Sequence, residues 1–391
     1  MKILSRILAV VIAIGCGAAS AEPTRPTDPG LVLAKVPATG DSPFKTLQTE
    51  LDRDPNNLQL ATALARAAIE LGRNTADPRY YGQAEAALAP WWNDSDAPTE
   101  AKLLRATIRQ AFHQFDPALA DLDAVIASEP GNAQARLSRA FIRMTRGTPG
   151  TAAADCATLD DPRLKLVAAI CQARADALTG KGEEAAKALI LVLTEERRAN
   201  VAMKKFALTV LADIKTGLGD WAATTRYYQQ VIAAGNADVA TVAAYADILL
   251  ALNKPKDALE LLDGQGSADI VILRQAIAAK RMGDPRLARW QAILADRFAA
   301  NQSSGSRVHM REEARYLLDV KDDAASALPL AGENFTVQKE PADAELLLRA
   351  AIAMKDAKAA QPVLDHIAST GLKDQRLEPL IAKLSVMESA T

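Results

Sequence analysis

An internal self-match restricts the fold of this chain more than any other feature. The segment 101–109, AKLLRATIR, aligns with the segment 135–143, ARLSRAFIR, and six of the nine positions are identical. The dipeptide Ala120-Asp121 recurs at the same offset as Ala154-Asp155. A period of about 34 residues accommodates two short helices and a turn, and one such hairpin cannot bury its apolar face alone. The sequence therefore predicts an array of stacked helical hairpins.

The composition agrees with a helical array. Alanine accounts for 80 of the 391 residues, and alanine has the highest helix propensity while letting neighbouring helices approach closely. We find no run of alternating β-branched residues bounded by turns, which is the pattern expected of strands. The sequence therefore favours an all-α fold.

Individual units resemble the tetratricopeptide repeat (TPR). One unit has Gly219, Trp221 and Tyr228 at the family's turn and helix positions, and the next has Pro255 and Ala258. The resemblance covers residues 45–385 and implies a right-handed α-solenoid of about eight to nine TPR-like helical hairpins. Residues 386–391 are expected to form a C-terminal tail.

The N-terminus has the features of an export signal. Lys2 and Arg6 precede the apolar stretch Ile7–Ile14, and the sequence Ala19-Ser20-Ala21 forms a cleavage site. We expect residues 1–21 to be a signal peptide cleaved before Glu22, residues 22–44 to be a Pro-rich leader, and the mature protein to be periplasmic. The alternative is a lipid anchor at Cys16, because the preceding residues partly match a lipoprotein box.

Two cysteines remain after such cleavage, Cys156 and Cys171. The repeat places them on helices of neighbouring hairpins, in a chain destined for an oxidising compartment. They are either two small core residues or a disulfide, and the sequence leaves both open.

A group of arginines has two possible roles. Arg105 and Arg139 occupy the same repeat position, and an aspartate follows each of them at the same spacing, Asp121 and Asp155 respectively. The arginines could form a basic strip for an acidic partner. We predict instead that each arginine pairs with its aspartate within a hairpin, because the repeat copies both members together.

Catalytic and nucleic-acid functions have little support. The net charge is −2, and a pI near 6.1 is not that of a nucleic-acid-binding protein. The three histidines, His113, His309 and His366, fall in different units without metal-ligand spacing, and we expect each at the surface or in a turn. We therefore expect no enzymatic activity, cofactor, metal site, nucleic-acid partner or transmembrane span.

The resemblance to TPR proteins implies a protein or peptide partner on the concave face. Our first hypothesis is a periplasmic scaffold for an envelope assembly or maturation complex, and the alternative is an accessory protein for envelope polysaccharide export or modification. The candidate lining of the concave face comprises Leu103, Thr107, Gln110, Leu137, Phe141, Met144, Ile170, Arg174, Thr209, Asp213 and Asp247.

Overall fold

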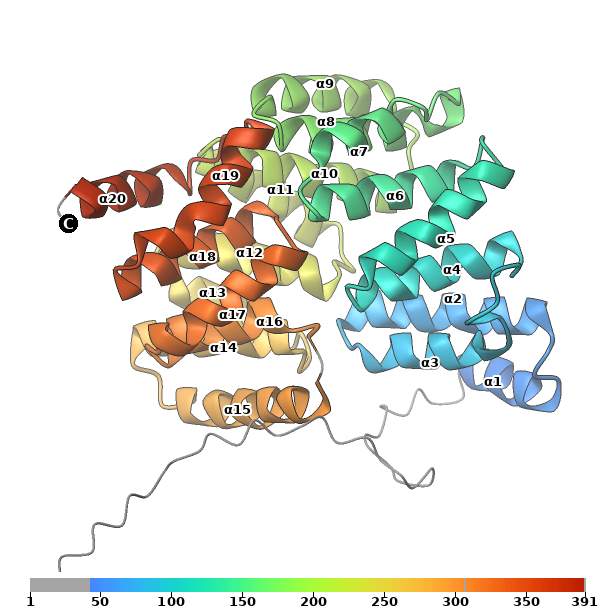
Figure 1. Cartoon of the computed structure of the whole chain (residues 1–391), viewed down its shortest axis with the longest axis horizontal. Helices are drawn as coiled ribbons and strands as arrows, with labels where there is room; N and C mark the ends of the chain where they lie inside the picture. Colours follow the sequence, from blue (N-terminus) through green and yellow to red (C-terminus); the bar gives the residue numbers. More distant parts are fainter. Residues whose placement is uncertain (1–42, 306, 390–391) are drawn as a thin grey trace, which may run out of the picture.

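The computed structural model describes residues 43–305 and 307–389, and over these ranges the chain is helical and contains no strand (Figure 1). The predicted signal peptide, its cleavage site, Cys16 and the leader up to residue 42 lie outside the described residues. None of the described helices is long and apolar enough to span a bilayer.

Nine consecutive helical hairpins form the body of the described chain, in agreement with the predicted solenoid. α1 (Pro43–Arg53) precedes them and α20 (Glu378–Ser389) follows them. The hairpins are α2 (Leu58–Thr75) with α3 (Arg79–Ala87), α4 (Thr99–Ala111) with α5 (Phe115–Ser128), α6 (Ala133–Thr145) with α7 (Pro149–Cys156), α8 (Lys165–Ala177) with α9 (Gly182–Glu195), α10 (Val201–Gly217) with α11 (Trp221–Ala233), α12 (Val239–Ala251) with α13 (Pro255–Leu262), α14 (Asp269–Met282) with α15 (Leu287–Ser304), α16 (Met310–Arg315) with α17 (Ala324–Val337), and α18 (Pro341–Met354) with α19 (Gln361–Thr370). A π-helical turn, η3 (Tyr316–Val320), extends α16.

The turn inside each of five successive hairpins, α4–α5 to α12–α13, has the same backbone design. Its central residue has a left-handed backbone conformation, with φ between 55° and 80°. The next residue donates its N–H to a carbonyl near the end of the preceding helix, as Thr148 does to Arg143 at 2.8 Å. This arrangement satisfies helix-end carbonyls and favours glycine or asparagine. The turn residues are His113, Gly147, Gly180, Gly219 and Asn253.

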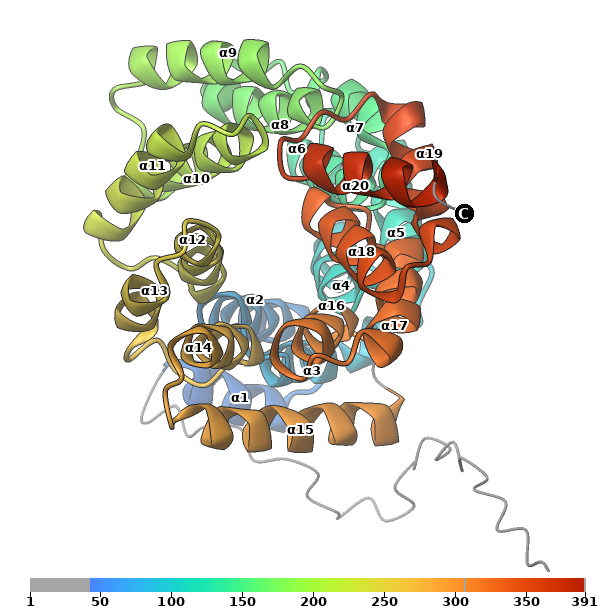
Figure 2. The same cartoon turned by 90° about the vertical axis from the view of Figure 1, so that its left-hand side faces the viewer.

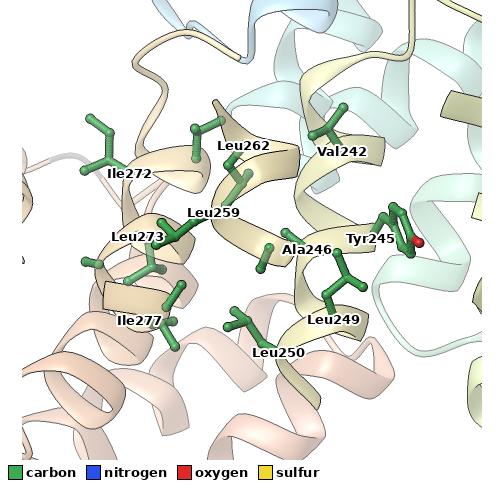
Figure 3. Close-up of a cluster of buried hydrophobic side chains, with 14 of the residues drawn as sticks. Val242, Tyr245, Ala246, Leu249, Leu250, Leu259, Leu262, Ile272, Leu273 and Ile277 are labelled. Atoms are coloured by element: carbon green, nitrogen blue, oxygen red, sulfur yellow. The ribbon is translucent and has the colours of Figure 1, made fainter. Parts of the chain in front are cut away.

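Small and branched apolar side chains join successive hairpins into a continuous core. In the cluster formed by α12, α13 and α14, Ala246, Leu262 and Leu273 are fully buried between the helices (Figure 3). Complete burial of one leucine side chain contributes about 1.5–3 kcal/mol, so repeated burial of this kind stabilises the stack.

The solenoid curves into a ring when it is viewed along its axis (Figure 2). α12 reaches back to contact α2, which completes one superhelical turn. Helices α16 to α20 then pass over the hairpins of that first turn. The backbone N–H of Lys339 donates to Thr145 and that of Gln375 donates to Gly217, both at 2.8 Å. We call this contact between α16–α20 and the turns that follow α4, α6, α8 and α10 the seam.

The two remaining cysteines form a disulfide. It joins Cys156 at the end of α7 to Cys171 in α8, with the Cα atoms 5.5 Å apart. Both residues are buried, at 2% and 0% exposure. The covalent bond therefore ties two neighbouring hairpins of the first turn together.

Candidate functional site

The repeated Arg/Asp pairs are contacts within hairpins, as the sequence predicted. Arg139 donates to Asp155 through Nε at 3.0 Å and through Nη2 at 2.5 Å. Arg105 and Asp121 form the same two-bond pair. All four side chains are at most 14% exposed, so these arginines do not form a free basic strip.

The inward face of the superhelix is the candidate binding surface, and aromatic side chains contribute to it. Phe141 on α6 and Phe206 on α10 have ring centroids 6.0 Å apart. The guanidinium of Arg174, on the intervening α8, lies 5.5 Å from the centre of the Phe141 ring. This distance fits a cation–π contact. Three successive hairpins thus contribute to one mixed aromatic and charged area.

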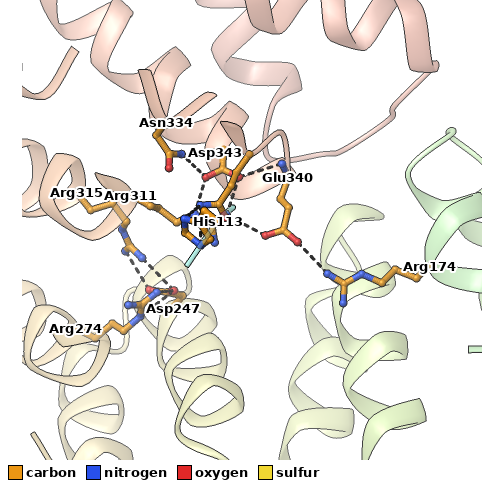
Figure 4. Close-up of polar contacts among 10 residues, drawn as sticks. His113, Arg174, Asp247, Arg274, Arg311, Arg315, Asn334, Glu340 and Asp343 are labelled. Atoms are coloured by element: carbon orange, nitrogen blue, oxygen red, sulfur yellow. Dashed lines mark hydrogen bonds and ion pairs between the residues drawn. The ribbon is translucent and has the colours of Figure 1, made fainter. Parts of the chain in front are cut away.

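Asp247 on α12 lies at the centre of an ion-pair cluster. It accepts hydrogen bonds from Arg274 at 2.6 Å and from Arg315, on α16, at 3.0 Å (Figure 4). Burial raises the pKa of Asp247, but the two guanidinium charges outweigh this effect and hold the pKa at about 2. Asp247 is therefore ionised and neutralised by this chain itself.

A second cluster joins α8 to α16 and α18 across the seam. Glu340 accepts hydrogen bonds from Arg174 at 3.0 Å and from Arg311 at 2.9 Å, and Arg311 also donates to Asp343 at 2.6 Å (Figure 4). Burial raises the pKa of Glu340, whereas the charges of Arg311 and Arg174 lower it to about 2. Burial raises the pKa of Asp343 despite the neighbouring charge of Arg311. The ion pair between Arg174 and Glu340 holds the last hairpins against the first turn.

Asp213 differs from Asp247, although both occupy the same position in successive repeats. Its carboxylate accepts a hydrogen bond from the Tyr228 hydroxyl at 2.7 Å, and within the described part of the chain it forms no ion pair. The Asp213 side chain is exposed. Burial of the carboxyl group nevertheless raises its pKa, and the charges of Arg174 and Arg376 only partly oppose this rise. It is therefore a carboxyl acceptor that a ligand can reach, and a cation placed beside it would favour its ionised form.

The other members of the predicted concave face divide into two groups. Met144 and Ile170 are 2% and 0% exposed, so the prediction that they face a partner is wrong. Met144 on α6 and Ile170 on α8 pack instead into the hydrophobic core between helices. The remaining five residues are half-buried: Leu103, Thr107, Gln110, Leu137 and Thr209.

Sequence reasoning missed the residues that the second superhelical turn contributes. Arg311 and Arg315 point inward and form ion pairs with Glu340 and Asp247, respectively. Their spacing places them one helical turn apart on the same face, but their partners Glu340 and Asp247 are 29 and 68 residues away in the chain. His366 is buried at 9% exposure, which corrects its expected surface position.

Comparison with known proteins identifies the fold. The chain is similar to a chain in the crystal structure of the APC/C hetero-tetramer Cut9–Hcn1, with a TM-score of 0.51 and 12% identity over 84% of this chain. It spans 63% of the length of that chain. It is also similar to a tetratricopeptide repeat protein from Parabacteroides merdae, with 14% identity, 62% of this chain and 97% of that chain covered, and a TM-score of 0.40.

No family model matches the sequence, and a search of curated protein sequences finds none that is similar. The structural match shows that the chain has the fold of a TPR solenoid.

Proposed function

We propose that this protein is a periplasmic TPR scaffold that binds a segment of a protein partner on its inward face, within an envelope assembly or maturation complex. The periplasmic location is supported by the sequence pattern of residues 1–21. A TPR solenoid offers a long curved surface, and such surfaces commonly bind other proteins. The solenoid fold favours a scaffold over an enzyme.

Asp213 is the single observation that carries the binding proposal. Its equivalent one repeat later, Asp247, is neutralised by two arginines that bond to it. Among the described residues Asp213 accepts a hydrogen bond from the Tyr228 hydroxyl and forms no ion pair, while Arg174 and Arg376 act on it only electrostatically. A lysine or arginine of a partner would supply a directly bonded cation. The half-buried Phe141 and Phe206 would pack against the apolar part of the same segment.

Site-specific photocrosslinking in cells tests the proposal. A photoreactive amino acid replaces Thr209, one helical turn before Asp213 on α10, and in a matched strain it replaces the outward-facing Leu191, which is 60% exposed. We expect a protein adduct from position 209 that Asp213→Asn weakens, and no such adduct from position 191. Adducts from position 191 alone would place the partner on the outer face and contradict the proposal.

Cell fractionation and intact mass address the location separately. The proposal requires a mature protein in the periplasmic fraction whose mass corresponds to a chain starting at Glu22. A cytoplasmic protein that retains Met1 would refute it.

A further inference from the structure

Histidines lie on both sides of the seam. His113 belongs to the α4–α5 turn of the first superhelical turn and contacts Gln338, which follows α17. His366, on α19, contacts the first turn from the opposite side: a Cβ added to Gly147 would lie 2.7 Å from its imidazole. Two of the three histidines of the chain therefore contribute to the contact that closes the superhelix.

The hydrogen bonds of the Gln338 side chain determine which protonation state of His113 can bond to it. Gln338 is 7% exposed, and its side-chain oxygen accepts a hydrogen bond from Arg311 at 3.2 Å. Its amide nitrogen therefore points to the imidazole, 3.2 Å from Nδ1 and 3.4 Å from Nε2. An amide nitrogen only donates, so a ring nitrogen must accept. Neutral histidine has one accepting nitrogen and the imidazolium has none, so the seam fits only the neutral form.

Burial and the charge of Arg311 oppose the protonation of His113. Arg311 and His309 come from α16 and the residue before it, while Glu312 on α16 and Glu340 before α18 act in the opposite sense. Burial is the largest effect, followed by Arg311, and together they lower the pKa of His113 from 6.5 to about 4. The pKa of His366 is lowered as well, mainly by burial and to a smaller extent by the charge of Lys339.

We propose that the seam is an acid-sensitive latch, in which protonation of His113 breaks its hydrogen bond with Gln338 and releases α16–α20 from the turns of the first superhelical turn. The contacts around it suit a latch. They include two backbone hydrogen bonds and the Arg174–Glu340 ion pair, which water can replace when the seam opens. The apolar contacts across the seam involve half-buried side chains, such as Leu178 and Val337. The latch depends on the fold alone and goes beyond the proposed scaffold role, since opening would change access to the inward face.

Hydrogen exchange of the mature protein tests the latch, read at the backbone amides of Lys339 and Gln375 that bond across the seam. The reference is the amide of Leu273, in the core of α14 and 0% exposed. If His113 has a pKa of 6.5 when the seam is open and about 4 when it is closed, lowering the pH from about 7.5 to about 5 reduces the closed-to-open ratio about 30-fold. We expect the protection factors of both seam amides, corrected for the intrinsic pH dependence of exchange, to fall by about this factor while that of Leu273 stays constant.

Two variants separate the latch from general acid sensitivity. His113→Asn keeps a residue that tolerates the left-handed turn but cannot take up a proton, so the fall in protection should disappear. Gln338→Glu replaces the donor with an acceptor, so protonated His113 gains a partner and protection should persist in acid. His366→Gln measures the share of the second histidine. Equal protection at both pH values, an equal fall at Leu273, or the full fall in His113→Asn would each overturn the proposal.

Discussion

Removal of the Asp121 carboxylate should cost far more stability than an ordinary surface ion pair. Asp121 is 5% exposed and accepts hydrogen bonds from Arg105 and, at 2.7 Å, from Arg109. The Arg105 side chain is also only 5% exposed, so Asp121→Ala leaves a buried guanidinium without its counter-charge. Breaking a buried pair in this way costs about 3–5 kcal/mol. The expected result is a loss of this size in the free energy of unfolding.

The buried guanidinium also holds a turn in place. Its Nη1 donates to the backbone carbonyls of Trp91, Trp92 and Asp94, at 2.5, 3.0 and 2.9 Å. Loss of the carboxylate should therefore loosen the connection between α3 and α4. Two of the four tryptophans of the chain lie at this turn, so the loosening should change the tryptophan fluorescence.

Two matched variants test whether the loss of stability depends on how deeply the ion pair is buried. Asp155→Ala removes the equivalent carboxylate one repeat later, where Arg139 is 14% exposed and Arg143 is 28% exposed, so water can partly solvate the freed arginines and the loss should be smaller. Glu100→Ala removes the ion-pair partner of Arg66. The Glu100 side chain is 45% exposed and that of Arg66 is 60% exposed, so this variant should lose at most about 1 kcal/mol of unfolding free energy.

Urea unfolding, followed by far-ultraviolet circular dichroism and by tryptophan fluorescence, measures all three variants. Both probes are needed because a solenoid can unfold in parts. The reasoning fails if Asp121→Ala costs no more than Glu100→Ala, or if Asp155→Ala costs more than Asp121→Ala.

Three further outcomes are expected. Reduction of the Cys156–Cys171 disulfide, which closes a loop of 15 residues, should destabilise the protein by about 3 kcal/mol in urea unfolding; an unchanged midpoint would argue against this bond. Asp247→Asn should lower the free energy of unfolding by about 2 kcal/mol above about pH 4, because the pKa of Asp247 is about 2 in the folded protein and 3.8 ordinarily. The difference in stability between wild type and variant should disappear as the pH falls towards 2. A gap that is constant with pH would contradict that origin. Gly180→Ala should raise hydrogen exchange at the seam, because a Cβ there would overlap the Gly371 carbonyl oxygen in a backbone with φ of 79°; unchanged exchange would mean that the seam does not need this glycine.

The hairpin level of the structure could be predicted from the sequence because its determinants recur locally. The Arg105–Asp121 pair was recognisable since both members return together one repeat later, as Arg139 and Asp155. A hairpin brings the two members of each pair into contact whatever the rest of the chain does. Local repetition therefore predicts contacts within one unit.

The superhelical level could not be predicted in this way. Whether α12 meets α2 depends on small rotations that accumulate over several hairpins, and a single-repeat pattern does not encode their sum. Asp213 and Asp247 illustrate the limit, because they have the same repeat position but different partners. Asp247 differs because Arg315 reaches it from 68 residues further along the chain.

Disulfide trapping across the seam tests the closed superhelix most directly. In the structure the N–H of Lys339 donates to the carbonyl of Thr145, which brings the end of α6 into contact with the connection between α17 and α18. With Cys16→Ser, and with Cys156 and Cys171 already joined, Thr145→Cys and Lys339→Cys introduce the two free thiols. The closed superhelix predicts that mild oxidation at neutral pH links them within one chain, seen as faster migration on a non-reducing gel and as one cross-linked peptide. Thiols that stay free, or that link only between chains, would show that the last hairpins do not rest on the first turn.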